Sequence, residues 1–243
     1  MKEHENLPLP LREVTGGRGR PLFHNDALLL IAHGSARYPD AGRIVLAHAE
    51  TIRAQGHFAE VAVGFLNGAP SAAEALASLS PRTIHVVPFF MEDGYFTRVA
   101  VPNALAGGEN LRFHPPVGTH PGIARLIRTR IAGHTPSDIV LVGHGSSKFP
   151  GRRMALHDHA EKLGALVAFL EEAPSLADAL ATAKGPLIAV IGVFAGQGGH
   201  VRDDLPALIE ASRERYGNEL LDLGSIGDEP GIVDLILEQL AHA

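Results

Sequence analysis

The stretch LLIAHGSARYP, residues 29–39, ends an apolar run with a His-Gly-Ser turn, and it returns as VLVGHGSSKFP at residues 140–150. Three further pairs of segments follow in the same order in the two parts of the chain. They are VGFLNGAPSAAEALA (63–77) with VAFLEEAPSLADALA (167–181), IHVVPFF (84–90) with IAVIGVF (188–194), and VGTHPGI (117–123) with IGDEPGI (226–232). Self-similarity of this kind decides the architecture of a protein. The sequence therefore predicts one structural unit written twice.

Each copy alternates short, continuous apolar runs with segments of helical spacing. In the first copy we expect strands at Ala27–Ala32, Ala59–Phe65 and Thr83–Phe90 and in the run near Val117. Continuous apolar runs indicate strands buried on both faces, as in a parallel sheet. The alternation with helices therefore predicts an α/β fold of two similar, doubly wound parallel-sheet halves that face a central cleft. We expect a flexible N-terminal extension over residues 1–25 and halves over residues 26–134 and 135–243.

Local signals support this interpretation in the first half. The segment Asp40–Ala54 has apolar residues at helical spacing, and a second helix is expected to begin at Ser71 with Glu74 at its third position. Ser followed by Glu three residues later is a typical helix start. The second copy is seven residues shorter between its first two repeated segments, which predicts a trimmed first helix or second strand.

Composition excludes several classes of protein. The 243 residues carry a net charge of −6 without a block of Lys or Arg, which argues against nucleic-acid binding. The absence of Cys excludes disulfides, iron–sulfur clusters and thiolate metal sites. No apolar run reaches the ~20 residues of a membrane span, and the first 22 residues have no signal-peptide core. We expect a cytoplasmic protein without nucleic-acid or membrane partners. Most of its 14 histidines are expected on the surface or in loops, among them His4, His24, His57, His114 and His134.

The remaining histidines occupy repeated positions directly after strands. His33 and His144 follow the first strand of each half, whereas His200 in GQGGHVRDDLP (196–206) corresponds to Phe96 in EDGYFTRVAVP (92–102). In such sheets ligands bind beyond the carboxyl ends of the strands, so we expect all four positions to share one crevice. The imidazoles of His144 and His200 would suit a borderline divalent metal such as Co²⁺, Fe²⁺ or Ni²⁺. Such incomplete coordination favours a metal that is passed on over a structural zinc.

Two other interpretations of the HGS turn are weaker. A single turn of this kind is more often a structural connection between strand and helix. The segment GHGSS (143–147) also lacks the Gly-x-Ser-x-Gly pattern of a hydrolase nucleophile elbow.

The HGS turn after the first strand, AFLEEAPS (168–175) and GGHVRDDLP (198–206) together resemble the sirohydrochlorin cobaltochelatases, which are class II tetrapyrrole chelatases, in a fused two-half form. The resemblance covers residues 27–240. It implies ATP-independent insertion of Co²⁺, or Fe²⁺ in siroheme-forming relatives, into a metal-free tetrapyrrole by a monomer or homodimer. The metal is then a substrate, and no organic cofactor is expected.

The resemblance also assigns roles to residues. It implies that His144 and His200 bind the metal and take protons from the pyrrole nitrogens. The corresponding pair in the first half is broken by Phe96, which leaves His33 as a secondary candidate. An acid from the first half is expected to face the pair, with Glu92 the best match and Asp93 its alternative.

A carboxylate-rich tetrapyrrole would need local cations on a chain of net negative charge. The candidates for substrate binding are Ser146, Arg37, Lys148 and Arg202, with Arg98 at the turn equivalent to that of Arg202. Exposed charges at helix starts are the alternative interpretation of each cation. The alternative function is a non-catalytic metal or tetrapyrrole carrier that retains the fold, although retention of a complete His pair favours catalysis.

Overall fold

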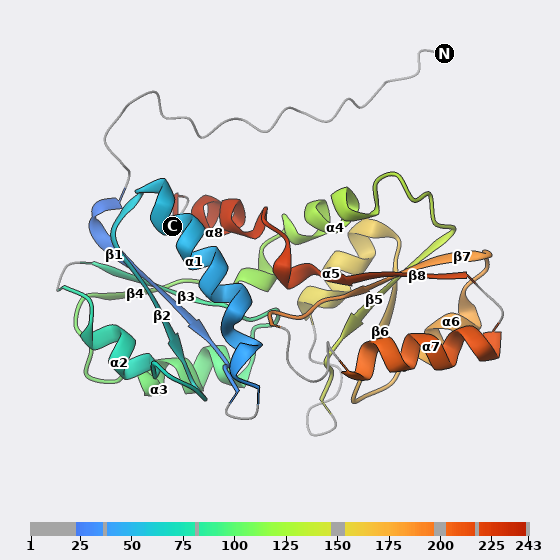
Figure 1. The fold of residues 1–243 in the computed structure, drawn as a ribbon, viewed down its shortest axis with the longest axis horizontal. Coiled ribbons are helices and arrows are strands. Elements are labelled where there is room, and N and C mark those ends of the chain that lie inside the picture. The colour runs from blue at the N-terminus through green and yellow to red at the C-terminus, as the bar shows by residue number, and fades with distance from the viewer. Residues whose placement is uncertain are drawn as a thin grey trace, which may run out of the picture.

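Two parallel four-stranded sheets form the framework of the molecule (Figure 1). The computed structural model describes residues 23–35, 38–80, 83–146, 154–196, 203–216 and 219–241. The first sheet has the order β2-β1-β3-β4 and the second the order β6-β5-β7-β8. The strands are β1 (Phe23–Ala32), β2 (Phe58–Phe65), β3 (Ile84–Pro88), β4 (Leu111–Phe113), β5 (Asp138–Gly143), β6 (Leu166–Phe169), β7 (Leu187–Gly192) and β8 (Glu219–Ser225). The shared strand order confirms the prediction of two similar parallel-sheet halves.

Helices cover both faces of each sheet (Figure 1). They are α1 (Arg43–Gln55), α2 (Ala72–Ala77), α3 (Val101–Ala104), α4 (Ile123–Ile131), α5 (Met154–Leu163), α6 (Leu176–Thr182), α7 (Leu205–Tyr216) and α8 (Ile232–Ala241). Short 3₁₀ turns η1 (Pro39–Gly42), η3 (Val117–Thr119) and η5 (Ile226–Asp228) and a π-helical turn η2 (Phe96–Ala100) complete the described elements. Within the described parts of the chain, no helix has the length and apolar character needed to cross a membrane.

Consecutive residues of the central strands enter different cores, which explains their continuous apolar sequence. Leu28 and Leu30 of β1 face a core shared by both halves, whereas Leu29 and Ile31 face an outer core with α2 and α3. The second sheet has an equivalent outer core with α6 and α7. The shared core joins both sheets to four helices, with Leu30 of β1, Leu141 of β5, Ile52 of α1, Ile127 of α4, Leu156 of α5 and Ile236 of α8. The two halves are therefore packed as one body.

Buried histidines link the halves at equivalent places. His48 of α1 donates from Nε2 to the carbonyl oxygen of Gly227 at 2.8 Å, and His159 of α5 donates from Nε2 to that of Gly118 at 2.7 Å. The two side chains are 5% and 1% exposed. Each bond runs from a helix of one half to the turn before the last helix of the other. These bonds satisfy carbonyl groups that would otherwise be buried without a partner.

The helix-start signals are confirmed in both halves. Ser71 and Glu74 form a reciprocal capping box at α2, and Ser175 and Asp178 form the same box at α6. The shortening of the second half affects both expected elements. α5 has 10 residues where α1 has 13, and β6 has 4 where β2 has 8.

Three expectations about local structure differ from the structure. β1 begins at Phe23, so residues 23–25 belong to the sheet. The fourth strand is Leu111–Phe113 and not the run near Val117, which begins the 3₁₀ turn η3. The reason is Pro115 and Pro116, which have no N–H to donate to a strand ladder. His114, expected on the surface, is only 6% exposed.

Candidate functional site

The two His-Gly-Ser turns lie at the carboxyl ends of β1 and β5, and both strands point toward the lower middle of the view in Figure 1. Gly34 and Gly145 have φ angles of +71° and +75°, in the left-handed region that favours glycine. A Cβ on Gly34 would lie 2.5 Å from the carbonyl oxygen of Asn67. Both turns therefore require glycine, and this fixes the His before each one at the end of its strand.

Each of these histidines is tied to the segment after the neighbouring strand. The carbonyl oxygen of His33 accepts the backbone N–H of Asn67 at 2.8 Å, and that of His144 accepts the backbone N–H of Glu171 at 3.0 Å. Asn67 and Glu171 occupy equivalent positions in the repeat. The same backbone frame thus presents an amide beside one His and a carboxylate beside the other.

In the second half, the partners of His144 define its protonated nitrogen. Nδ1 donates to the carbonyl oxygen of Gly145 at 3.2 Å and lies 3.6 Å from the Glu171 carboxylate. Both neighbours are acceptors, so the proton of the neutral ring resides on Nδ1. With the proton on Nδ1, the lone pair of the neutral ring lies on Nε2.

In the first half, His33 has different surroundings. The side-chain amide of Asn67 donates to His33 Nε2 at 3.3 Å, and the ring packs edge-on against Phe96 at 4.7 Å between centroids. Burial lowers the pKa of His33, and repulsion from the His144 ring lowers it further. The two HGS histidines therefore have unequal partners.

Glu92 crosses from the first half to the second. Its carboxylate accepts the backbone N–H groups of Ala155 at 3.2 Å and Leu156 at 3.0 Å, in the first turn of α5. These are N–H groups that a helix start leaves without an internal partner. Glu92 thus links the loop after β3 to the helix that follows the second HGS turn. Its predicted role as the acid facing His144 stays a prediction.

The equivalent loop of the second half also reaches across. A Cβ on Gly196, which occupies the position of Glu92 in the repeat, would lie 2.9 Å from the carbonyl oxygen of Ala41 in η1. Gly196 therefore packs against the turn η1, which follows the first HGS motif.

Asp93 is occupied within its own loop. One oxygen accepts the Thr97 hydroxyl at 2.7 Å, and the other accepts Nε and Nη2 of Arg98 at 3.0 and 2.7 Å. The hydrogen bonds from Arg98 are the main cause of a lowered pKa of Asp93. Among the two acids expected to face the His pair, Asp93 is thus already held in an ion pair.

Glu171 and Glu172 were not identified from the sequence as site residues. Glu172 accepts the backbone N–H of Ser146 at 3.1 Å, so it supports the turn that holds His144. The signal that could have found both is the repeat itself, because they stand where the first half has Asn67 and Gly68. Divergence at an otherwise repeated position marks a difference in task between the halves.

The sequence matches the CbiX family twice, over residues 27–134 and over residues 138–243. The chain belongs to the CbiX family. A probable sirohydrochlorin cobaltochelatase of Halobacterium salinarum is 26% identical over 266 residues, covering 89% of this chain and 91% of the relative. The predicted resemblance is thereby confirmed.

Solved structures agree with this assignment to the CbiX family. The structure of CbiX, described as the terminal enzyme for siroheme biosynthesis in denitrifying bacteria, aligns with a TM-score of 0.67 at 27% identity and covers 90% of this chain and 99% of that one. A multi-domain protein of Deinococcus radiodurans with structural similarity to chelatases aligns with a TM-score of 0.76 at 23% identity. That alignment covers 89% of this chain and 55% of the Deinococcus protein, about half of its length.

Several predicted site residues of this CbiX-family chain lie outside the described residues: His200, Arg37, Lys148 and Arg202. Over the ranges that the structure describes, no group of three or more His, Asp or Glu side chains is placed to hold a metal ion. Of the predicted metal pair, the structure therefore places His144 alone. Arg98, the described cation of the set, is paired with Asp93.

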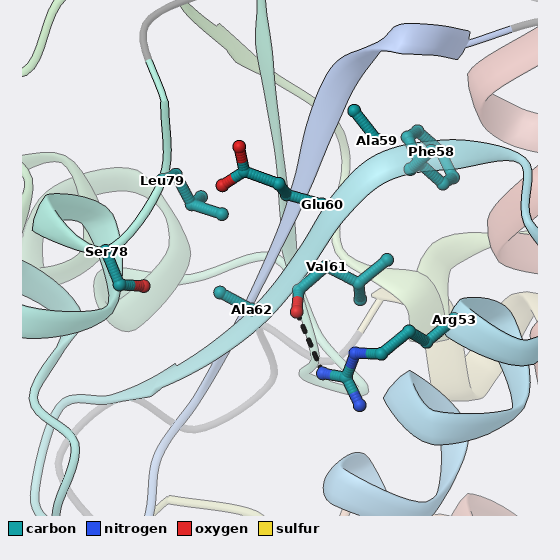
Figure 2. A pocket seen from close by; sticks show the side chains of 8 residues that line it. All are labelled: Arg53, Phe58, Ala59, Glu60, Val61, Ala62, Ser78 and Leu79. Carbon is teal, nitrogen blue, oxygen red and sulfur yellow. Dashed lines mark hydrogen bonds between the residues drawn. The ribbon is translucent and has the colours of Figure 1, made fainter.

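A small cavity elsewhere on this CbiX-family protein is not the site. It has a volume of about 290 Å³ and lies along the amino half of β2, between Arg53 of α1 and Ser78 after α2 (Figure 2). Arg53 donates there to the carbonyl oxygen of Val61 at 2.8 Å. Because β2 ends at Phe65, this cavity is removed from the carboxyl ends of the strands, where His33 and His144 lie.

Proposed function

We propose that the chain is an ATP-independent chelatase that inserts Co²⁺ or Fe²⁺ into sirohydrochlorin. The observation that carries the proposal is His144, whose Nδ1 is oriented by Gly145 and Glu171 so that Nε2 can act at the carboxyl end of β5. Membership of the CbiX family, the Halobacterium relative named as a cobaltochelatase and the siroheme enzyme of denitrifying bacteria support this choice. The first two favour a place in cobalamin biosynthesis, and the last favours one in siroheme biosynthesis.

The reaction requires a base and a transient metal ligand. When M²⁺ enters the macrocycle, two pyrrole N–H bonds break and two protons leave, so the product carries the metal without a change in total charge. A neutral imidazole can bind the incoming ion and accept a proton near neutral pH. In this proposal His144 Nε2 has both tasks, and His200 from the segment after β7 is its partner.

Two carboxylates are candidates for the acid that balances the charge of the cation. Glu171 lies 3.6 Å from His144 Nδ1 and stabilises the imidazolium that forms when Nε2 takes a proton. Glu92 comes from the opposite half and already bonds to α5. Asp93 is the weaker alternative because Arg98 engages it.

The cations predicted to attract the substrate complete the proposal. Arg37, Lys148 and Arg202 follow the motif histidines closely in sequence, and Ser146 ends the second HGS triplet. Arg and Lys pair well with the many carboxylates of sirohydrochlorin. Their places in the sequence, close after His33, His144 and His200, support substrate contacts from both halves.

The test is anaerobic incubation of sirohydrochlorin with Co²⁺, Fe²⁺ or Ni²⁺, without nucleotide, followed by absorbance. We expect the protein to accelerate insertion of Co²⁺ or Fe²⁺. His144→Ala should lower the rate by about 100-fold or more, in the range of general acid–base catalysis. His33→Ala should lower the rate much less, because the His33 ring is already engaged by a hydrogen bond from Asn67 and by packing against Phe96.

Two outcomes would contradict the proposal. A protein that binds sirohydrochlorin but accelerates insertion of none of the three metals would be a carrier. Equal loss of activity in His33→Ala and His144→Ala would show that the site is not centred on the second half.

A further inference from the structure

An aromatic surface lies on the first half beside His33. It consists of Tyr95, Phe96 and Val99, whose exposed fractions are 66%, 43% and 40%. Scattered apolar side chains on a surface are ordinary, but a contiguous group marks a place where something binds. These three residues belong to one turn of the chain, around η2.

The ring of Phe96 is held in a fixed position. It packs edge-on against His33 at 4.7 Å, stacks parallel to Phe90 at 6.0 Å and meets Tyr95 edge-on at 5.7 Å. Such ring pairs contribute beyond the area they bury. Phe96 is therefore preorganised, and yet it keeps nearly half of its surface exposed.

The loop that carries Phe96 lies between the two halves. Glu92 bonds to the first turn of α5 in the second half, and Phe96, four residues later, contacts His33 of the first half. The aromatic surface thus adjoins the first HGS turn, and its loop also contacts the helix that follows the second one.

The two halves present opposite chemistry at equivalent positions. The second half has His144 with Glu171 and Glu172, whereas the first half has Asn67 and Gly68 in place of the two acids. Phe96 stands where the second half has His200. At these positions the second half has ionisable side chains where the first half has an amide, a glycine and an aromatic ring.

We propose that Phe96, with Tyr95 at its edge, is the ring on which the planar tetrapyrrole macrocycle stacks, with the opposite face of the macrocycle turned toward His144. This inference rests on the proposed function and assigns the broken half a positioning task. A planar, conjugated ligand gains from stacking on an aromatic ring. Its carboxylates remain at the periphery, where cations can reach them, and its pyrrole nitrogens face the imidazole that takes their protons.

The test is anaerobic titration of the protein with metal-free sirohydrochlorin, followed by absorbance and fluorescence quenching, together with steady-state kinetics. Phe96→Leu should raise the Kd for sirohydrochlorin and its KM by about tenfold, with a smaller change in kcat, because loss of stacking on one aromatic ring is of this order. Phe96→Tyr keeps the ring and should stay within about twofold of the unchanged protein. The KM for Co²⁺ should not change in either variant.

Phe113→Leu is the matched control. Phe113 is 46% exposed, close to the value for Phe96, but lies on the edge strand β4 away from both HGS turns. We expect wild-type affinity from this variant. Thermal unfolding shows whether each of the three variants remains folded at the assay temperature, which separates binding from stability.

The outcomes distinguish this inference from the proposed function. If the unchanged protein binds sirohydrochlorin and Phe96→Leu binds it equally well, the stacking surface is wrong and the function stands. If the unchanged protein binds no sirohydrochlorin, the function fails and this inference with it. Sedimentation tests whether a second copy of the chain binds to the aromatic surface instead. A dimer that Phe96→Leu dissociates, at unchanged sirohydrochlorin affinity, would assign the surface to self-association and overturn the inference.

Discussion

At the residue scale, the two halves share one backbone arrangement around the motif His but differ in the side chains beside it. Asn67 and Glu171 donate the same backbone N–H to the carbonyl oxygen of a motif His, yet they present an amide and a carboxylate to its ring. An amide that donates to Nε2 of His33 occupies its lone pair, whereas the Glu171 carboxylate lies beside Nδ1 of His144. In our proposal this difference in side chains makes His144 the base and leaves His33 as a packed ring.

The first prediction separates the two acids. Glu171→Gln should lower kcat for metal insertion by about 10- to 100-fold, the usual effect of removing a group that orients a ligand His, with little loss of stability. Glu92→Gln should lower the free energy of unfolding by about 1 kcal/mol, because it weakens the cap of α5, and should reduce kcat less. Steady-state rates and urea unfolding of both variants decide this. A larger kcat loss in Glu92→Gln, at unchanged stability, would identify Glu92 as the opposed acid.

The sequence predicts His144 as a site residue because its motif is repeated and follows a strand, and this stays a prediction. The partner of its ring could not be predicted. Glu92 was expected there because the resemblance implies an acid from the first half opposite the His pair, and Glu92 fits that place best. Glu171 is distant from the motif along the chain and reaches His144 only because β5 and β6 are neighbours in the sheet. Contacts of this kind depend on register, which the apolar pattern does not specify at single-residue level.

At the element scale, helices α1 and α5 connect the halves through buried imidazoles. Each crosses to a carbonyl oxygen of the opposite half, His48 to Gly227 and His159 to Gly118. Both glycines are closely packed, since a Cβ on Gly118 would lie 2.1 Å from Met91 Cα and one on Gly227 would lie 2.2 Å from the Phe194 carbonyl oxygen. The orientation of the two sheets therefore depends on a few precise polar contacts within an apolar core.

The second prediction tests this link. His159→Ala should lower the free energy of unfolding by about 1–3 kcal/mol, because it leaves the buried carbonyl of Gly118 without its donor. His157→Ala is the control, since His157 is an exposed residue of the same helix. Urea unfolding of both variants provides the comparison. Equal destabilisation would show that the bond across the halves contributes nothing specific.

The elements themselves were largely predictable, for identifiable reasons. Continuous apolar runs predicted β1, β2 and β3, because each sheet is buried on both faces, and Ser71 predicted the start of α2. The fourth strand was misplaced at Val117 because the three-residue strand Leu111–Phe113 has a weak apolar pattern. Residues His48 and His159 could not be recognised as buried, because their partners are backbone carbonyls distant in sequence.

At the scale of the whole molecule, fusion of two copies in one chain allows each to specialise. The halves share one core and the same strand order, so their frames are equivalent. In our proposal only one frame carries the base, and the other builds a binding surface. Phe96, which breaks the pair in the first half, is in our proposal the residue that gives that half its task.

Several buried histidines should also make the stability of the whole molecule depend on pH. Nδ1 of His85 and Nε2 of His114 are joined by a hydrogen bond of 2.9 Å. Nε2 of His85 lies 3.4 Å from the Asp26 carboxylate. Burial, repulsion from His85 and the nearby charge of Arg112 lower the pKa of His114 to about 4. Burial likewise lowers the pKa of His48, His85 and His159.

The third prediction follows from the sign of these shifts. An unfolded His has a pKa of about 6.5. Between pH 6.5 and 4 the unfolded chain therefore binds more protons than the native one, and the free energy of unfolding falls as the pH falls through this window. His114 alone should contribute a loss of about 2 kcal/mol, less than its full shift would give, because solvent screens the repulsion from Arg112. Urea unfolding at pH 8, 6, 5 and 4.5 measures it. His114→Gln should flatten the dependence of the free energy of unfolding on pH, whereas the exposed control His134→Gln should not. Parallel pH profiles for the two variants would rule out the buried His pair as a source of acid sensitivity.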